Sequence, residues 1–166
     1  MSKYIPELAT PEQRLDEAAI RALSDRYTDA VNHRDWAAYR DCWTDDAVWD
    51  LGPPVNQRKD GLDAIMEEVQ RAVGAMDLFV QMAHAFTLLE LEGDGGTART
   101  TLNEVGRILP ESRDLLGGAE GVNILAIYTD RVVRGVDRRW RFSRRSYRVA
   151  LFSGQAPEGD VIPAAA

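Results

Sequence analysis

The sequence is poor in the residues that hold metal ions and disulfides. It has one cysteine, Cys42, and two histidines, His33 and His84, among 166 residues. One cysteine excludes a disulfide within the chain and suits a reducing compartment, so we expect a cytoplasmic protein. Neither an HExxH nor a CxxC pattern occurs, and we therefore expect no metal site. Cys42 falls among apolar helix positions and is interpreted as a core residue.

Long hydrophobic runs and an excess of positive charge are also missing. No apolar stretch approaches the roughly 20 residues that a membrane-spanning helix needs, and the start, MSKYIPELATPEQ, is too polar for a signal peptide. The sequence has 20 basic and 27 acidic residues, which gives a net charge of −7 and argues against broad nucleic-acid binding. The arginines that crowd residues 131–148 are interpreted as a partly buried, solvated sheet edge.

The hydrophobic pattern changes its period half-way along the chain. Apolar residues recur at three- and four-residue steps after a helix cap at Thr10, again around Trp36, and again after Gly61. From residue 78 onward the period becomes two, and the sequence GDGG marks a hairpin between two of the strands. The predicted strands are residues 78–92, 97–109, 121–134 and 140–152, with a shorter one at TDDAVWDLG.

Helices first and strands last predict an α+β fold. We expect a cone-shaped α+β barrel, in which three N-terminal helices pack on a curved, mostly antiparallel sheet and enclose a small-molecule pocket. The length suits a single domain, residues 1–166, with a core of about 15–152 and a tail of 153–166. Both faces of the last hairpin are half apolar, so we expect a homodimer or homotrimer through the outer sheet face.

Two ionisable residues interrupt apolar rows on neighbouring strands. His84 shares its parity with Met82 and Phe86, and Glu104 shares its parity with Leu102. A hairpin in which paired residue numbers sum to about 188 would place His84 directly opposite Glu104, with Cβ atoms roughly 5 Å apart. An imidazole beside a buried carboxylate is a candidate proton-transfer pair, and a satisfied structural pair is the alternative.

Other residues complete the predicted pocket. Tyr27 is the last aromatic residue on the apolar face of the first helix, either as a core residue or as a hydrogen-bond donor to substrate. Asp35 is interpreted as a helix cap and His33 as exposed. Parity does not decide which of Arg145 and Arg148 faces inward. The candidate substrate-binding residues are Met82, Phe86, Leu102, Trp49, Tyr128 and Arg148.

The ordered stretches IRALSDRYTDAVNHRDWAAYRDCWTDDAVWD, GLDAIMEEV, MAHAFTLLELEGDGGTART and IYTDRVVRGVDRRWRFSRRSYRV resemble the SnoaL-like branch of the nuclear transport factor 2-like superfamily. The resemblance covers about residues 15–152. It implies the cone fold, dimers or trimers, and a site that uses no metal or cofactor. Members of this branch include scytalone dehydratase, bile acid 7α-dehydratase, a hexachlorocyclohexane dehydrochlorinase, polyketide cyclases and steroid isomerases.

The resemblance also implies roles for particular residues. Pockets of this branch commonly pair an Asp near the end of the first helix with a His in the third-strand region, and His84 matches that histidine. Tyr27 matches a tyrosine that binds or polarises substrate, and Glu104 falls near a carboxylate or second histidine on the next strand. The Asp position of the pattern Y-x4-D-x2-D-W holds Asn32, whose amide cannot accept a proton at neutral pH.

The leading hypothesis is a cofactor-independent lyase or isomerase of the dehydratase or cyclase type. It would act by general acid–base catalysis on a hydrophobic, ring-bearing small molecule such as a polyketide, a steroid or an aromatic metabolite. His84 would move the proton, Glu104 would orient His84, and Tyr27 and Asn32 would hold an oxygen of the substrate. The alternative is a non-catalytic module of the same fold that binds a small molecule or another protein.

Overall fold

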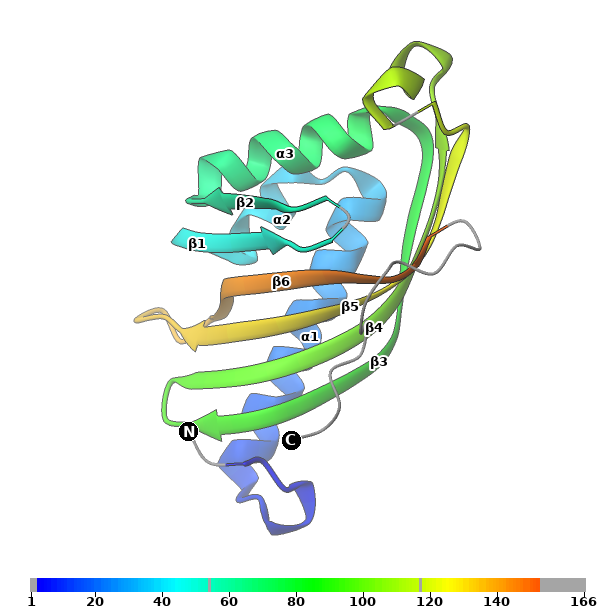
Figure 1. Ribbon diagram of the computed structural model, residues 1–166. Coiled ribbons are helices and arrows are strands. Elements are labelled where there is room, and N and C mark those ends of the chain that lie inside the picture. Colours follow the sequence, from blue (N-terminus) through cyan, green and yellow to red (C-terminus); the bar gives the residue numbers. More distant parts are fainter. Residues whose placement is uncertain (1–2, 54, 117, 153–166) are drawn as a thin grey trace.

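The computed structural model describes residues 3–53, 55–116 and 118–152, and in this part three helices pack on one face of a six-stranded sheet (Figure 1). The predicted α+β cone is confirmed, although its sheet does not close, and the expected tail lies outside the described residues. The elements are η1 (Pro6–Leu8), α1 (Pro11–His33), α2 (Trp36–Asp41), β1 (Trp43–Leu51), β2 (Gln57–Asp60), α3 (Leu62–Gly74), β3 (Met76–Glu92), β4 (Gly95–Ile108), η2 (Pro110–Leu116), β5 (Gly121–Arg134) and β6 (Trp140–Phe152).

The first two helices begin at the caps that the sequence predicts. The Oγ1 of Thr10 accepts a hydrogen bond from the backbone N–H of Gln13, whose side chain accepts one from the backbone N–H of Thr10 in return. α1 ends at Arg34, which adopts a left-handed conformation with φ of 55°. Asp35 then caps α2 by accepting a hydrogen bond from the N–H of Ala38. None of the described helices is long and apolar enough to cross a membrane.

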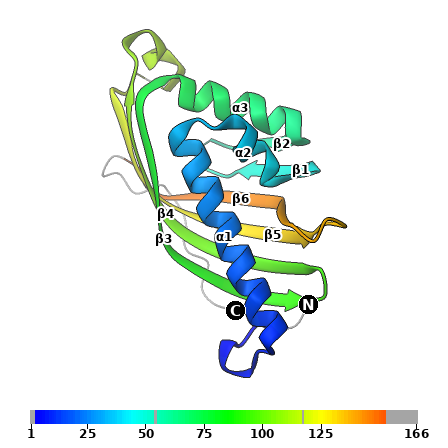
Figure 2. The ribbon, with the colours of Figure 1, turned by 180° about the vertical axis from the view of Figure 1, so that it is seen from behind.

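The sheet has the strand order β2-β1-β6-β5-β4-β3. β1 runs parallel to β6, and every other neighbouring pair is antiparallel. Figure 2 shows α1 crossing the strands on the inner face of the sheet, while α3 packs over β1 and β2. Because alternate residues of each strand point to the inner face, the side chains of β3, β4, β5 and β6 meet those of α1 and α2 in one interior.

The pairing of β3 with β4 contradicts the predicted register. β-Bulges near Leu89 and at His84 shift the pairing, so that Gln81, and not His84, lies opposite Glu104. A bulge inserts one unpaired residue and so reverses the parity of the strand beyond it. The prediction that His84 and Glu104 oppose one another was therefore wrong.

Candidate functional site

Asn32, near the end of α1, binds the main chain of β3. Its Nδ2 donates to the carbonyl oxygen of Gln81 at 2.8 Å, and its Oδ1 accepts from the backbone N–H of Gln81 at 2.7 Å. The amide thus takes the place of one rung of a β-ladder on the edge strand of the sheet. This contact attaches α1 to β3 and fixes the direction in which the side chain of Gln81 points.

The side chain of Gln81 reaches a buried carboxylate. Its Nε2 donates to Oε1 of Glu104 at 2.7 Å, and the hydroxyl of Tyr147 donates to Oε2 at 2.6 Å. Burial raises the pKa of Glu104, while these two hydrogen bonds partly oppose the rise. Within the described part of the chain no cationic side chain forms an ion pair with Glu104, so its charged form is stabilised by neutral donors alone.

Three tyrosines extend the network from Gln81 into the interior. Nε2 of Gln81 donates to the hydroxyl of Tyr128 at 3.3 Å, and that hydroxyl lies 3.3 Å from the hydroxyl of Tyr27. The hydroxyl of Tyr39 donates to Tyr27 at 3.1 Å. Burial raises the pKa of each of these phenols, so they act as neutral hydrogen-bonding groups and not as phenolate bases.

A buried ion pair lies at the centre of the interior. Nε and Nη2 of Arg145 donate to the two carboxylate oxygens of Asp130, both at 2.8 Å, and the guanidinium lies about 4 Å from the ring centroids of Tyr27, Tyr128 and Phe142. Burial lowers the pKa of Arg145, but the charge and hydrogen bonds of Asp130 outweigh burial and raise that pKa overall. The interior thus holds a permanent cation whose charge is balanced by Asp130.

Three buried donors in this interior have no hydrogen-bond partner within the described residues. They are the indole N–H groups of Trp43 and Trp49 and the Nη1 of Arg145. Trp49 and Arg145 lie side by side on the paired strands β1 and β6, and the rings of Trp43 and Trp49 are 6.2 Å apart. Because buried donors are normally satisfied, this group is suited to bind an oxygen atom brought by a ligand.

The residues of this interior are nearly closed to solvent. Glu104, Trp49 and Tyr147 are 8%, 7% and 6% exposed, and Arg145 is 1% exposed. No group of three or more His, Cys, Asp or Glu in the described ranges is arranged to hold a metal ion.

Three residues expected in the pocket lie outside it. His84 is exposed, and its Nε2 lies 2.7 Å from Oδ1 of Asn103. Met82 is 43% exposed because the bulge at His84 reverses the parity of its part of β3. Arg148 points to the outer face, since it pairs with Ile127, whereas Arg145 pairs with Asp130 and is buried. The inward placements predicted for His84 and Met82 were therefore wrong. Of the two arginines left open by parity, Arg145 faces inward, so the candidate substrate-binding residue Arg148 lies outside the interior.

The remaining candidates do face the interior. Tyr27, Tyr128, Trp49 and Leu102 are buried in the main core, and the half-buried ring of Phe86 lies 4.7 Å from the guanidinium carbon of Arg21. Sequence reasoning assigned no role to Gln81 or Tyr147, which flank Glu104. The bulge that turns Gln81 inward leaves no clear signal in the sequence. Tyr147 lies on the row of β6 residues with Val149, but parity alone did not show which row faces inward.

The comparisons with known proteins agree with this architecture. The model of the SnoaL-like domain family matches residues 12–146. No curated protein sequence matches the chain at a significant level.

Several solved structures share the fold. A protein assigned as an aromatic ring hydroxylase from Novosphingobium aromaticivorans is 24% identical, with a TM-score of 0.74, over 89% of this chain and 96% of its own. A protein assigned as a scytalone dehydratase from the same species is 16% identical, with a TM-score of 0.74, over 93% and 97%. The hexachlorocyclohexane dehydrochlorinase LinA-type3 from Novosphingobium barchaimii is 20% identical, with a TM-score of 0.71, over 92% and 97%. At these identities the likeness shows the fold alone.

The raised pKa of Glu104 predicts a pH-dependent stability that Glu104→Gln removes. Because the folded-state pKa lies above the ordinary value of 4.5, the folded protein binds this proton more tightly than the unfolded chain does. The resulting stabilisation is fully present below about pH 4.5 and is lost as the pH rises through the folded-state pKa. Urea unfolding of both proteins from about pH 4 to 8 should show the free energy of unfolding of the native protein falling relative to the variant. A constant difference would contradict the prediction.

The two-point contact of Asn32 predicts that the carboxylate of Asn32→Asp destabilises the fold. At neutral pH it would keep the bond from the N–H of Gln81 but would face the carbonyl of Gln81 without a proton to donate, at a cost of about 1–3 kcal/mol. Near pH 4 part of the carboxyl groups are protonated, and the loss should shrink. Asn32→Ala is the control, since it loses both bonds at every pH. Equal stability of the native protein and Asn32→Asp in urea unfolding at pH 7 would refute the assignment.

Proposed function

Since this chain belongs to the SnoaL-like domain family, we propose that it is a cofactor-independent lyase or isomerase in which Glu104 transfers the proton. The observation that carries the proposal is the environment of this carboxylate, which is buried, has a raised pKa and is held by Gln81 and Tyr147. A carboxyl group with a pKa closer to neutrality is a better general acid–base catalyst at physiological pH. His84 has no part in this proposal, because its ring lies on the outer side.

The mechanism follows from the hydrogen-bond donors that surround Glu104 and from the unpartnered donors deeper in the interior. In its ionised form Glu104 would take a proton from a carbon atom of the substrate, and the donors Gln81 and Tyr147 keep the carboxylate oriented for the transfer. Negative charge that develops on a substrate oxygen would be stabilised by the unpartnered N–H groups of Trp43, Trp49 and Arg145. The same carboxyl group, once protonated, can return its proton to another atom of the substrate.

The lining of the interior supports a hydrophobic, ring-bearing substrate with at least one oxygen or other electronegative substituent. Aromatic rings of Tyr27, Tyr128, Trp43 and Trp49 would contact the ring of the substrate. The packed rings must move apart to admit it. The names of two structural neighbours, a scytalone dehydratase and a hexachlorocyclohexane dehydrochlorinase, describe eliminations, and we infer a reaction of that class.

A second candidate function is a binding module without catalysis. Asn32 occupies the position where the family pattern has an acid, and the residue to which it binds is Gln81. Both side chains are amides, and neither can take up a proton at neutral pH. In this case the unpartnered donors of Trp43, Trp49 and Arg145 would bind a ligand and release it without a chemical change.

The outer sheet face supports a homodimer. Val80, Met82, Val105 and Leu151 are exposed on this face, next to the half-buried Leu125 and Ile127. An apolar patch of this kind on a sheet face is suited to pack against a second copy.

Val105→Lys should weaken this dimer, because it places a charge in the apolar patch. We expect a dimer dissociation constant at least about tenfold higher in sedimentation velocity runs over a range of concentrations. Val136→Lys, in the fully exposed turn between β5 and β6, is the matched control and should leave association unchanged. A native protein that stays monomeric at all concentrations would contradict the dimer.

Catalysis by Glu104 predicts that Glu104→Gln loses turnover and His84→Ala does not. The assays use scytalone, followed by its absorbance, and hexachlorocyclohexane, followed by chloride release. For whichever compound is converted, we expect kcat of Glu104→Gln to fall by roughly 10²–10⁴-fold. His84→Ala is the matched control. It removes an ionisable side chain from β3, the strand next to that of Glu104, but this side chain lies on the outer side of the sheet. Retained turnover in Glu104→Gln would refute the role of Glu104, and binding of either compound without conversion would favour the module.

A further inference from the structure

The eight arginines between residues 131 and 148 differ sharply in their surroundings. Five of them bind a carboxylate, namely Arg134, Arg139, Arg141, Arg144 and Arg145. Arg131 and Arg148 lie exposed on the outer sheet face and form no ion pair with any residue that the structure describes. Solvation of the sheet edge alone does not explain why five of these arginines bind a carboxylate while Arg131 and Arg148 do not.

Like charges meet directly across the strands at one end of the outer face. Arg131 on β5 pairs with Arg144 on β6, and Thr97 on β4 pairs with Arg131 from the other side. In the next row, Arg99 lies opposite Thr129. Like charges directly opposite each other destabilise a sheet. Asp50 binds Arg144, whereas Arg131 forms no ion pair with any described residue. An anion bound at Arg131 would therefore relieve the repulsion that remains.

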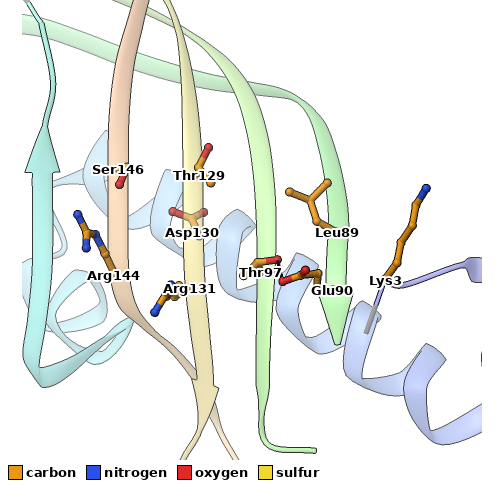
Figure 3. Close-up of a pocket in the computed structure, with 9 residues that line it drawn as sticks. All are labelled: Lys3, Leu89, Glu90, Thr97, Thr129, Asp130, Arg131, Arg144 and Ser146. Carbon is orange, nitrogen blue, oxygen red and sulfur yellow. Dashed lines mark hydrogen bonds between the residues drawn. The ribbon is translucent and has the colours of Figure 1, made fainter. Parts of the chain in front are cut away.

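A groove of about 630 Å³ follows these rows across the outer face (Figure 3). The hydroxyls of Thr129 and Ser146 face it and form no hydrogen bond to any described side chain, whereas the hydroxyl of Thr97 donates to Glu90. Figure 3 shows Arg131 and Arg144 close together at one end and Lys3 at the other. The lining consists of Lys3, Leu89, Glu90, Thr97, Thr129, Asp130, Arg131, Arg144 and Ser146.

The two ends of the groove are held in place. Arg144 is 3.0 Å from Asp50, and Lys3 is fixed beside Glu90 by a β-bridge and by the hydrogen bond from the N–H of Tyr4 to the carbonyl of Leu89. Four strand spacings separate Arg144 from Lys3, which corresponds to about 19 Å. This span exceeds the size of a single small ion, and the groove is open to solvent along its length.

We propose that this groove binds a small molecule that carries phosphate groups, at a site separate from the interior of the cone. Lys3, Arg131 and Arg144 line the groove together with the outward-facing carboxylate of Glu90, while Asp130 turns inward to Arg145. Asp50 binds Arg144 from outside the lining, and an excess of positive charge remains at Arg131 and Lys3. The guanidinium of Arg131 and the hydroxyls of Thr129 and Ser146 supply more donors than one carboxylate can accept, and phosphate oxygens match them. The site does not depend on the reaction proposed for Glu104.

The test is isothermal titration calorimetry with inorganic pyrophosphate as the probe and citrate as a carboxylate of comparable charge. We expect the native protein to bind pyrophosphate, to bind it more tightly than citrate, and to bind it more weakly as KCl is added. Arg131→Gln should weaken binding by at least about tenfold. Arg148→Gln is the matched control, since it removes an exposed, unpaired arginine from the same face outside the groove, and it should bind pyrophosphate as the native protein does.

Several results would overturn the proposal. These are absence of pyrophosphate binding at millimolar concentrations, citrate binding as tight as pyrophosphate binding, and an equal loss of affinity in Arg131→Gln and Arg148→Gln. Thr129→Glu provides a second test, because it adds a negative charge on the exposed surface of the groove and should abolish binding while the melting temperature is kept. If Arg131→Gln instead abolished self-association and no variant bound pyrophosphate, the groove would belong to the contact between two copies.

Discussion

The contact between Asn32 and Gln81 is the constraint on which the inner face depends. β3 is the edge strand of the sheet in the described part of the chain, and the amide of Asn32 satisfies both backbone groups of Gln81 on the open side of that edge. This contact fixes α1 over the sheet and aims the side chain of Gln81 at Glu104 and Tyr128. An aspartate at position 32 could accept from the N–H but could not donate to the carbonyl while ionised. The two-point contact with Gln81 therefore requires an amide at position 32.

Two buried carboxylates in the same interior have opposite surroundings. Asp130 is matched by a guanidinium that binds both of its oxygens, and breaking such a buried pair typically costs about 3–5 kcal/mol. Glu104 is matched only by the neutral donors Gln81 and Tyr147. Burial raises the pKa of both carboxyl groups, but only at Asp130 does a neighbouring cation oppose the rise. The two carboxyl groups therefore differ in the partner that stabilises their charged form.

The sequence predicted the elements well because their signals are local. The capping residues Thr10 and Asp35 mark the helix starts, and the change from a helical to an alternating pattern marks the strands. Which residues of β3 face inward at Gln81 and Met82 depends on the β-bulges at His84 and Leu89, which no turn or capping residue marks in the sequence. A slip of one residue exchanges the two faces of a strand, which is why His84 and Met82 were assigned to the interior and Gln81 was missed.

Consecutive side chains of β6 point to opposite faces of the sheet, so two neighbouring arginines lie in different surroundings. Arg145 points inward, where Asp130 and three aromatic rings surround it, whereas Arg144 points outward beside Arg131. The outer face is itself divided, since Val105, Leu125 and Leu151 make one end apolar while the end near Arg131 is basic. An apolar surface favours a second protein copy and a cationic groove favours an anion. A dimer formed through the apolar end would leave the groove at the edge of the interface, so that both could be occupied together.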